Sequence, residues 1–205
     1  MVGNLLPRDG ILRLVPDAVA EPDAVMARLK AEIDWRQDVA MIVGRQMKLP
    51  RLTAWHGDAG YRYSGIDNPP RAWTPLLGEL KAAAEGIAGA VFNSVLLNLY
   101  RDGQDGMGWH ADDERPLGQD PVIASLSFGA VRRFRLKHKT IQGMGLTLEL
   151  PPGSCLVMAG ALQHHWLHAL PKTRRPIGPR INLTFRLIGS PDQELRAARL
   201  GISPQ

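Results

Sequence analysis

The spacing of hydrophobic and polar residues changes near the middle of this 205-residue chain. In the first part, apolar residues recur at helical spacing in two segments, which is typical of helices that pack one face on a core. The first predicted helix begins at Pro22, after Glu21, because proline suits the first helical position. Its apolar face carries Met26, Leu29 and Ile33.

A second helix is predicted between Thr74, a suitable N-cap followed by Pro75, and Gly89, where the helix should end. Its apolar positions are Leu76, Leu77, Leu80 and Ile87. Between the two helices, residues 35–73 are rich in glycine, proline and aromatic residues. That composition predicts short strands and long loops, where binding residues often lie.

From Val91 onward the pattern is that of β-structure. Short apolar or alternating runs occur at 91–100, 122–128, 131–137, 145–150, 154–159 and 181–188. Turn sequences such as Pro151-Pro152-Gly153 separate them. We therefore predict an α+β fold, a sandwich or jelly roll with both helices on one outer face. A single domain is expected over 1–205, with helices and loops in 1–90 and the β core in 91–190.

Charge and composition restrict the environment and the partners. The formal net charge of +5 and the pI of about 9.7 permit a polyanionic partner without requiring one. The basic residues cluster at Arg132, Arg133, Arg135, Lys137 and Lys139, and again at Lys172, Arg174 and Arg175. Cys155 is the single cysteine, so a disulfide within the chain is excluded. With no membrane span or secretion signal recognised, we expect a cytoplasmic monomer.

Candidate chemistry begins at His110-Ala111-Asp112, which follows the strand predicted at 91–100 and a glycine-rich turn. An imidazole and a carboxylate two residues apart lie on one side of an extended chain. With one distant histidine they would form a facial triad, the ligand set of non-haem Fe(II) oxygenases. A His-x-Asp pair alone is weak evidence. We interpret His56 and His138 as ordinary surface or core histidines.

The third ligand would come from His164, His165 or His168. If the chain is extended over 163–168, His164 and His168 share one face and His165 lies on the other. This alternation disfavours His165 if His168 is the ligand, but it does not separate His164 from His168.

The last predicted strand has one polar face and one apolar face. Its polar residues are Arg180, Asn182, Thr184 and Arg186, and its apolar residues are Ile181, Leu183, Phe185 and Leu187. An exposed polar face is the simple interpretation, but two arginines on one face could also bind a dicarboxylate, because guanidinium groups pair with carboxylates. Asn98 and Tyr100 share a face of the strand before the turn to His110 and could complete such a pocket. Metal and pocket together indicate an Fe(II)/2-oxoglutarate oxygenase.

These motifs resemble the AlkB family of alkylation-repair dioxygenases. The matching segments are Asn98-Leu99-Tyr100, the run from His110 to Glu114, Ser125-Leu126-Ser127-Phe128-Gly129, His168, and Arg180-Ile181-Asn182-Leu183-Thr184-Phe185-Arg186. The closing Arg-x-Asn-Leu-Thr-Phe-Arg is specific to that family. The stretch from Pro50 to Gly65 is similar to the nucleotide-recognition lid of the family.

The resemblance implies a double-stranded β-helix (jelly roll) core, Fe(II) as the metal and 2-oxoglutarate as co-substrate. It selects His168 as the third metal ligand, because the family's distal ligand precedes an apolar-Pro step, here Leu170-Pro171. It implies that 2-oxoglutarate is bound by Asn98, Tyr100, Arg180, Asn182 and Arg186. Arg180 would hold the remote carboxylate and Arg186 would lie nearer the iron. No catalytic residue is implied beyond the metal site.

The implied reaction is oxidative demethylation of bases such as 1-methyladenine and 3-methylcytosine in DNA, using O2 and releasing succinate, CO2 and formaldehyde. The base would be flipped out of the duplex. Tyr63 and the His110 ring would enclose it, Glu114 would favour cationic methylated bases, and Arg51 would meet a phosphate.

Val43-Gly44 occupies the position at which the duplex-repairing branch of the family has an aromatic residue. That residue acts as a wedge, because it fills the gap that the flipped base leaves in the duplex. A smaller wedge would open a duplex less efficiently, so single strands remain an alternative substrate. RNA, a protein or a small metabolite are alternatives to DNA. A non-catalytic jelly-roll binding module is the alternative to an enzyme.

Overall fold

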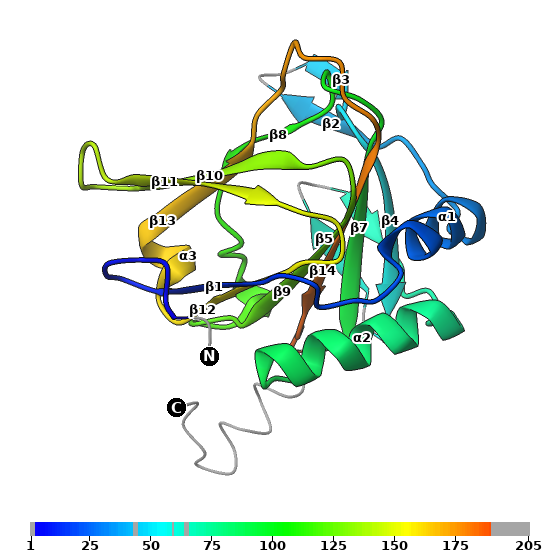
Figure 1. The fold of residues 1–205 in the computed structure, drawn as a ribbon, viewed down its shortest axis with the longest axis horizontal. Coiled ribbons are helices and arrows are strands. Elements are labelled where there is room, and N and C mark those ends of the chain that lie inside the picture. The colour runs from blue at the N-terminus through cyan, green and yellow to red at the C-terminus, as the bar shows by residue number, and fades with distance from the viewer. Residues whose placement is uncertain (1–2, 43–44, 59, 64–65, 190–205) are drawn as a thin grey trace.

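Two antiparallel β-sheets face each other in the computed structural model, which describes residues 3–42, 45–58, 60–63 and 66–189 (Figure 1). The larger sheet has the strand order β1-β12-β9-β14-β7-β4, and the smaller sheet has the order β11-β10-β13-β8. In the larger sheet these strands are β1 (Ile11–Val15), β12 (Cys155–Ala159), β9 (Ile123–Gly129), β14 (Arg180–Arg186), β7 (Ser94–Tyr100) and β4 (Leu52–Gly57). In the smaller sheet they are β11 (Gly145–Leu150), β10 (Arg132–His138), β13 (Trp166–Leu170) and β8 (Met107–His110). The predicted jelly-roll architecture is therefore confirmed.

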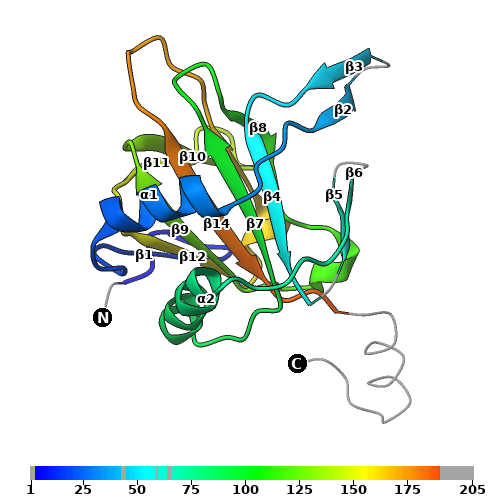
Figure 2. The same cartoon turned by 90° about the vertical axis from the view of Figure 1, so that its right-hand side faces the viewer.

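Both predicted helices cover the outer face of the larger sheet (Figures 1 and 2). Helix α1 (Pro22–Glu32) begins at the predicted proline, and α2 (Pro75–Ala88) begins after Thr74. The Thr74 side chain accepts a hydrogen bond from the Leu77 backbone N–H at 3.2 Å, and Gly89 ends the helix with φ 67°. Glycine suits that left-handed conformation because it has no Cβ.

Strand β14 separates an apolar core from a polar interior. Its residues Ile181, Leu183 and Phe185 are fully buried against residues of the helices and neighbouring strands. The opposite face of β14 is buried too, since Arg180 and Arg186 are only 2% and 4% exposed. The prediction of two distinct faces is confirmed, and the interpretation of the polar face as solvent-exposed is excluded.

The structure differs from the sequence-based picture at three places. Strand β14 ends at Arg186, so Leu187, expected on the apolar face, is 48% exposed beyond the sheet. The chain is not extended throughout 163–168, the condition under which the three histidines were compared, because a helical turn, α3 (Leu162–His165), precedes β13. Strand β1 was not predicted, because five residues are too few to show a clear alternation of apolar and polar positions. The strand forms by pairing with β12.

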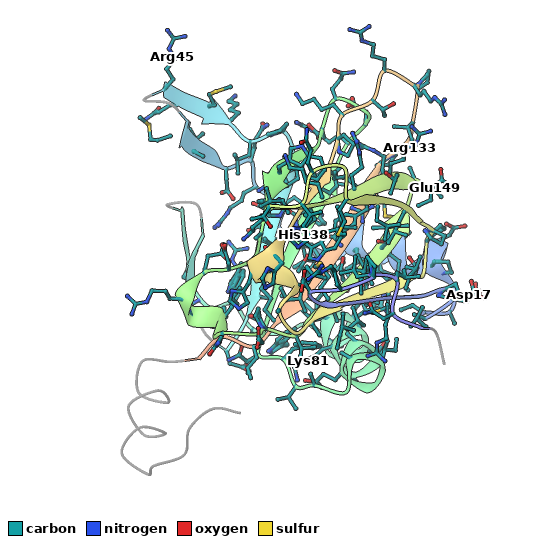
Figure 3. The ribbon with its side chains drawn as sticks, turned by 90° about the vertical axis from the view of Figure 1, so that its left-hand side faces the viewer. Asp17, Arg45, Lys81, Arg133, His138 and Glu149 are labelled. Carbon is teal, nitrogen blue, oxygen red and sulfur yellow. The ribbon has the colours of Figure 1, made fainter. Side chains whose placement is uncertain are left out.

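Residues 35–73 form short strands and loops, as predicted. Besides β4 they contain two hairpins, β2 (Val39–Ile42) with β3 (Arg45–Lys48), and β5 (Tyr61–Tyr63) with β6 (Ile66–Asn68). Figure 2 shows both hairpins projecting from the same side of the molecule, and Arg45 stands at the end of the first one (Figure 3). Val43-Gly44 lies outside the described residues. None of the helices that the structure describes is both long and apolar enough to cross a membrane.

Candidate active site

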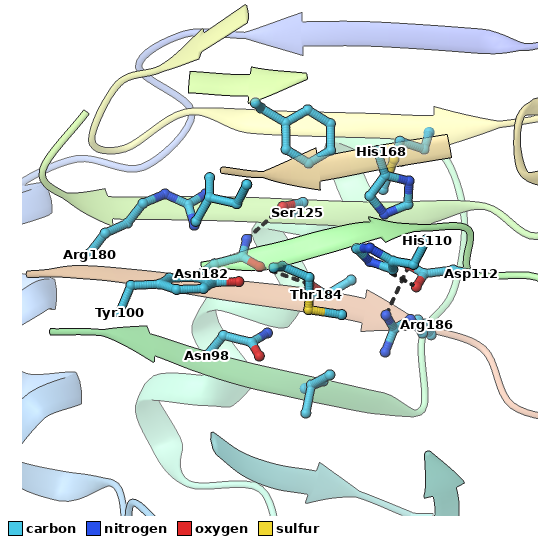
Figure 4. Close-up of a pocket in the computed structure, with 15 residues that line it drawn as sticks. Asn98, Tyr100, His110, Asp112, Ser125, His168, Arg180, Asn182, Thr184 and Arg186 are labelled. Atoms are coloured by element: carbon cyan, nitrogen blue, oxygen red, sulfur yellow. Dashed lines mark hydrogen bonds and ion pairs between the residues drawn. The ribbon is translucent and has the colours of Figure 1, made fainter. Parts of the chain in front are cut away.

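A pocket lies between the two sheets and contains the polar face of β14 (Figure 4). Its polar lining residues are Asn98, Tyr100, His110, Asp112, Ser125, His168, Arg180, Asn182, Thr184 and Arg186. Apolar side chains complete the wall at Leu96, Met107, Phe134, Met158 and Leu170. All predicted metal ligands and all predicted co-substrate residues therefore meet in one cavity.

His110, Asp112 and His168 come together at one end of this pocket (Figure 4). One potential ligand atom from each lies within 4.8 Å of the other two. His110 and His168 are direct partners in the β8–β13 ladder, and their ring centroids are 4.2 Å apart. Strand pairing thus places the two imidazoles side by side, and Asp112 reaches them from just beyond the end of β8.

Hydrogen bonds fix the orientation of two triad members. Arg186 donates to Asp112 Oδ2 at 2.9 Å, and the Asp112 backbone N–H donates to Gln163 Oε1 at 2.9 Å. His110 Nδ1 lies 2.9 Å from the Gly108 carbonyl oxygen. A carbonyl only accepts, so Nδ1 carries the proton and Nε2 keeps its lone pair. That nitrogen is 3.9 Å from Asp112 Oδ1.

The electrostatics keep the triad in the protonation state that a metal requires. Burial alone would raise the pKa of Asp112, but the charge of Arg186 and the two imidazoles outweigh burial and hold that pKa far below its ordinary value. Burial, together with the neighbouring His110, lowers the pKa of His168 to about 3. Burial also lowers the pKa of His110. At neutral pH the site therefore presents one carboxylate and two neutral imidazoles.

The triad fits a metal ion in a second respect. Asp112 Oδ1 and His168 Nδ1 are buried and have no hydrogen-bond partner in the described part of the chain. A buried polar atom without a partner is costly, so native proteins rarely retain one without a reason. Two nitrogens and one carboxylate oxygen around a common point form the facial ligand set of non-haem Fe(II).

The opposite end of the pocket is built around Arg180 and Tyr100 (Figure 4). Arg180 is 2% exposed, donates to Ser127 Oγ at 2.9 Å, and lies 5.6 Å from the centroid of the Tyr100 ring. Burial lowers its pKa to about 10, so the guanidinium stays charged at neutral pH. No carboxylate pairs with it among the residues that the structure describes. A buried unpaired cation favours an anionic ligand.

The neighbouring polar groups differ in how far the protein already satisfies them. Asn98 Oδ1 is buried without a hydrogen-bond partner among the described residues. This oxygen only accepts hydrogen bonds, so a carboxylate would be bound by the amide N–H of Asn98. Asn182, in contrast, donates to Ser125 Oγ at 2.6 Å and to the Leu126 carbonyl at 3.1 Å, and accepts from Thr184 at 3.0 Å. Asn182 therefore has little hydrogen-bonding capacity left, and its binding role stays a prediction.

The predicted substrate residues are less closely gathered. The side chain of Tyr63 lies outside the described part of the structure, although its backbone belongs to β5. Glu114 is half-buried and directly precedes the short helix η1 (Arg115–Leu117). Arg51 is only 4% exposed and its charge acts on His110, so it lies near the metal end. The contact of Arg51 with a phosphate stays a prediction.

Sequence reasoning assigned no role to three residues that support the site. Gln163 holds the Asp112 backbone, Ser125 holds Asn182, and Ser127 holds Arg180. The two serines alternate with apolar residues on β9, a signal that could have marked an inward polar face. Gln163 carried no such signal, because the turn of α3 brings it to Asp112. His164, left open as a ligand, faces Asp120 at 3.2 Å instead.

A jelly roll with two histidines and one carboxylate at one end of a pocket and a buried arginine at the other defines an Fe(II)/2-oxoglutarate oxygenase. The family model of the 2OG-Fe(II) oxygenase superfamily matches residues 12–186. Fe(II) and 2-oxoglutarate are accordingly the metal and the co-substrate of this class.

Within that class, the chain belongs to the AlkB family. It is 40% identical over 179 residues to human alpha-ketoglutarate-dependent dioxygenase alkB homolog 3. The aligned region covers 83% of this chain and 63% of the relative. It is 38% identical over 181 residues to human DNA oxidative demethylase ALKBH2. That aligned region covers 82% of this chain and 69% of the relative. The chain thus spans just under two thirds of the first relative. The structure of OsALKBH1 shares the fold, with a TM-score of 0.61 at 17% identity over 88% of this chain and 97% of that one.

Proposed function

We propose that this protein is an Fe(II)- and 2-oxoglutarate-dependent dioxygenase that removes N-methyl groups from nucleic acid bases, with DNA as its substrate. The observation that carries the proposal is the presence of the triad and the buried Arg180 at opposite ends of one pocket. In the proposed reaction one O2 oxidises 2-oxoglutarate to succinate and CO2 and hydroxylates the methyl group. The resulting hemiaminal collapses to formaldehyde and the unmodified base.

His110, Asp112 and His168 would hold the iron. When bound, Fe(II) supplies the open coordination positions at which O2 and the 2-oxo acid meet. Arg186 keeps Asp112 ionised through their 2.9 Å ion pair, and the His110–Gly108 contact keeps the Nε2 lone pair of His110 free. These outer contacts orient the ligands, a role that commonly has large effects on metal affinity.

Arg180 would bind the remote carboxylate of 2-oxoglutarate, and Asn98 and Tyr100 would complete its hydrogen bonds. Their placement supports this assignment. Tyr100 and Arg180 are direct partners across the β7–β14 ladder, and Asn98 lies two residues before Tyr100 on the same face. Arg186 lies at the triad end of the same strand face, which supports a role beside the metal-proximal carboxylate.

A nucleic acid partner is supported by the outside of the smaller sheet. Arg133, Arg135 and Lys137 alternate along β10 and are all exposed. Trp109, next to His110 in sequence, is 40% exposed, with Lys137 4.6 Å and Arg135 5.7 Å from its ring. A cationic surface with an aromatic side chain suits a polyanionic strand. Arg132, counted in the same basic run, points inward and is buried.

The methyl groups of 1-methyladenine and 3-methylcytosine lie on the pairing edge, so such a base must leave the duplex before it can react. The His110 ring, whose side chain is 25% exposed, is the triad member that a flipped base could reach. Glu114, four residues further, would favour the positive charge of these methylated bases. Tyr63 is proposed as the second ring of the base pocket.

The test is formaldehyde release from oligonucleotides that carry one defined methylated base, supplied as single-stranded DNA, duplex DNA and RNA. Asp112→Ala should abolish release. Asp113→Ala is the matched control, since Asp113 has an exposed side chain paired with Lys139 at 3.4 Å and should retain most activity. Activity in Asp112→Ala would refute the iron assignment. Release from RNA but not from DNA would refute DNA as the substrate.

A further inference from the structure

A second buried guanidinium, that of Arg132, does not line the pocket but lies close enough to Arg180 for its charge to act on it. Arg132 is the first residue of β10 and is 3% exposed. Burial is the main cause of the lowered pKa of Arg180, and the positive charge of Arg132 adds to it. Two buried cations therefore act on the same end of the pocket.

Arg132 binds backbone carbonyls rather than carboxylates. It donates to the carbonyl oxygens of Asp102 at 3.1 Å, Asp105 at 3.0 Å and Pro171 at 2.8 Å. The carboxylate of Asp105 is occupied by Arg101, with contacts of 2.8 and 2.9 Å. Arg132 thus has no carboxylate as a hydrogen-bond partner among the described residues, although the nearby carboxylates of Asp102 and Asp105 act on its charge. Its hydrogen bonds tie the turn after β7 to the segment after β13.

Both tied segments begin at residues that line the pocket. Tyr100 directly precedes the first segment, and Leu170 directly precedes Pro171. The two segments are also in close contact, because the Thr173 N–H donates to the Gly103 carbonyl at 2.8 Å. A Cβ on Gly103 would lie 2.5 Å from the Thr173 carbonyl oxygen, so no larger residue fits there without backbone movement. Tyr100, the strand partner of Arg180, therefore directly precedes a tightly packed segment.

We propose that Arg132 is a positioning residue for the remote carboxylate of the 2-oxo acid and makes the pocket select dicarboxylates over monocarboxylates. This role rests on the proposed function. The three carbonyl contacts hold Tyr100 opposite Arg180 before the ligand arrives, which removes an ordering cost from binding. The second cation strengthens the attraction for a carboxylate in a buried, low-dielectric site.

The test compares the dissociation constants of 2-oxoglutarate and 2-oxopentanoate, which lacks the remote carboxylate. They are measured by calorimetry on the anaerobic Fe(II)-loaded protein, so no turnover is needed. Arg132→Met should weaken 2-oxoglutarate binding about tenfold, or about 1.4 kcal/mol, and leave 2-oxopentanoate within about twofold. Arg132→Lys keeps the charge, but an ammonium group cannot bind all three carbonyls as the guanidinium does. This variant should therefore bind 2-oxoglutarate about threefold more weakly.

Arg133→Met is the matched control. Arg133 follows Arg132 on β10 but points to the outside, where it lies beside Glu149, its partner on β11 (Figure 3). Its removal takes away one positive charge and should leave both constants unchanged. If Arg133→Met weakens 2-oxoglutarate binding as much as Arg132→Met does, the effect is only one of overall charge and the proposal is wrong.

Two other outcomes would overturn the role of Arg132. Unchanged binding of 2-oxoglutarate in Arg132→Met removes any role, and an equal loss for both ligands shows a merely structural one. If Arg132→Met does not fold, Arg132→Lys is the test. A ratio of the 2-oxoglutarate and 2-oxopentanoate dissociation constants equal to that of the wild type would then refute the proposal. A wild-type protein that binds neither acid would refute the proposed function itself.

Discussion

Removing the Arg186 guanidinium should destabilise the metal-free protein strongly, because it leaves the Asp112 carboxylate buried without its charged partner. The side chains of Arg186 and Asp112 are 4% and 2% exposed, and their ion pair measures 2.9 Å. Breaking a buried pair from one side costs about 3–5 kcal/mol. For a chain of this size, such a loss corresponds to a melting temperature lower by about 6–20 °C. We therefore expect this loss in Arg186→Met.

The loss should depend on the charge of Asp112. In the double variant Asp112→Asn, Arg186→Met the uncompensated carboxylate is gone, so at least about half of the loss should be recovered. Anaerobic addition of Fe(II) to Arg186→Met should likewise recover stability, since a cation bound by Asp112 replaces the guanidinium charge. Urea unfolding, followed by tryptophan fluorescence, measures the free energy of unfolding of each variant with Fe(II) and with a metal chelator. Strictly additive losses in the double variant would refute the reasoning.

Four further predictions concern folding stability. The pKa of His168 is about 3 in the folded protein against 6.5 as its ordinary value, so the unfolded chain binds the proton first and stability is lost as pH falls below 6.5. The metal-free protein should lose about 2 kcal/mol from this group between pH 7 and pH 5, and urea midpoints in His168→Gln should show a flatter profile. Thr74→Ala should lower the free energy of unfolding by about 1 kcal/mol, because α2 loses its N-cap hydrogen bond. Gly106→Ala should destabilise by more than about 1 kcal/mol, since its Cβ would lie 2.6 Å from the Leu170 carbonyl oxygen. Gly78→Ala, inside α2 with open space around it, should stabilise the protein by up to about 1 kcal/mol in the same assay.

Local patterns were sufficient for much of the fold. The two helices, with Thr74 and Pro22 at their starts, follow from capping chemistry and periodicity that involve only neighbouring residues. The strand alternation of β14 was equally readable, since a period of two assigns alternate residues to opposite faces. Strand β1 lacked such a signal because its stability comes from pairing with β12, a segment distant in sequence.

The sequence by itself determined that Arg180, Asn182 and Arg186 share one face, and that His110 and Asp112 lie close together, because both facts depend on local backbone geometry. Only the tertiary structure decided that the polar face is buried, that His168 is the strand partner of His110, and that α3 turns His164 away. Similarly, the chain order alone gives Arg132 and Arg133 equal standing as surface cations. Sheet closure buries the first against three carbonyls and leaves the second exposed, because adjacent strand residues point to opposite sides and only packing defines the inside.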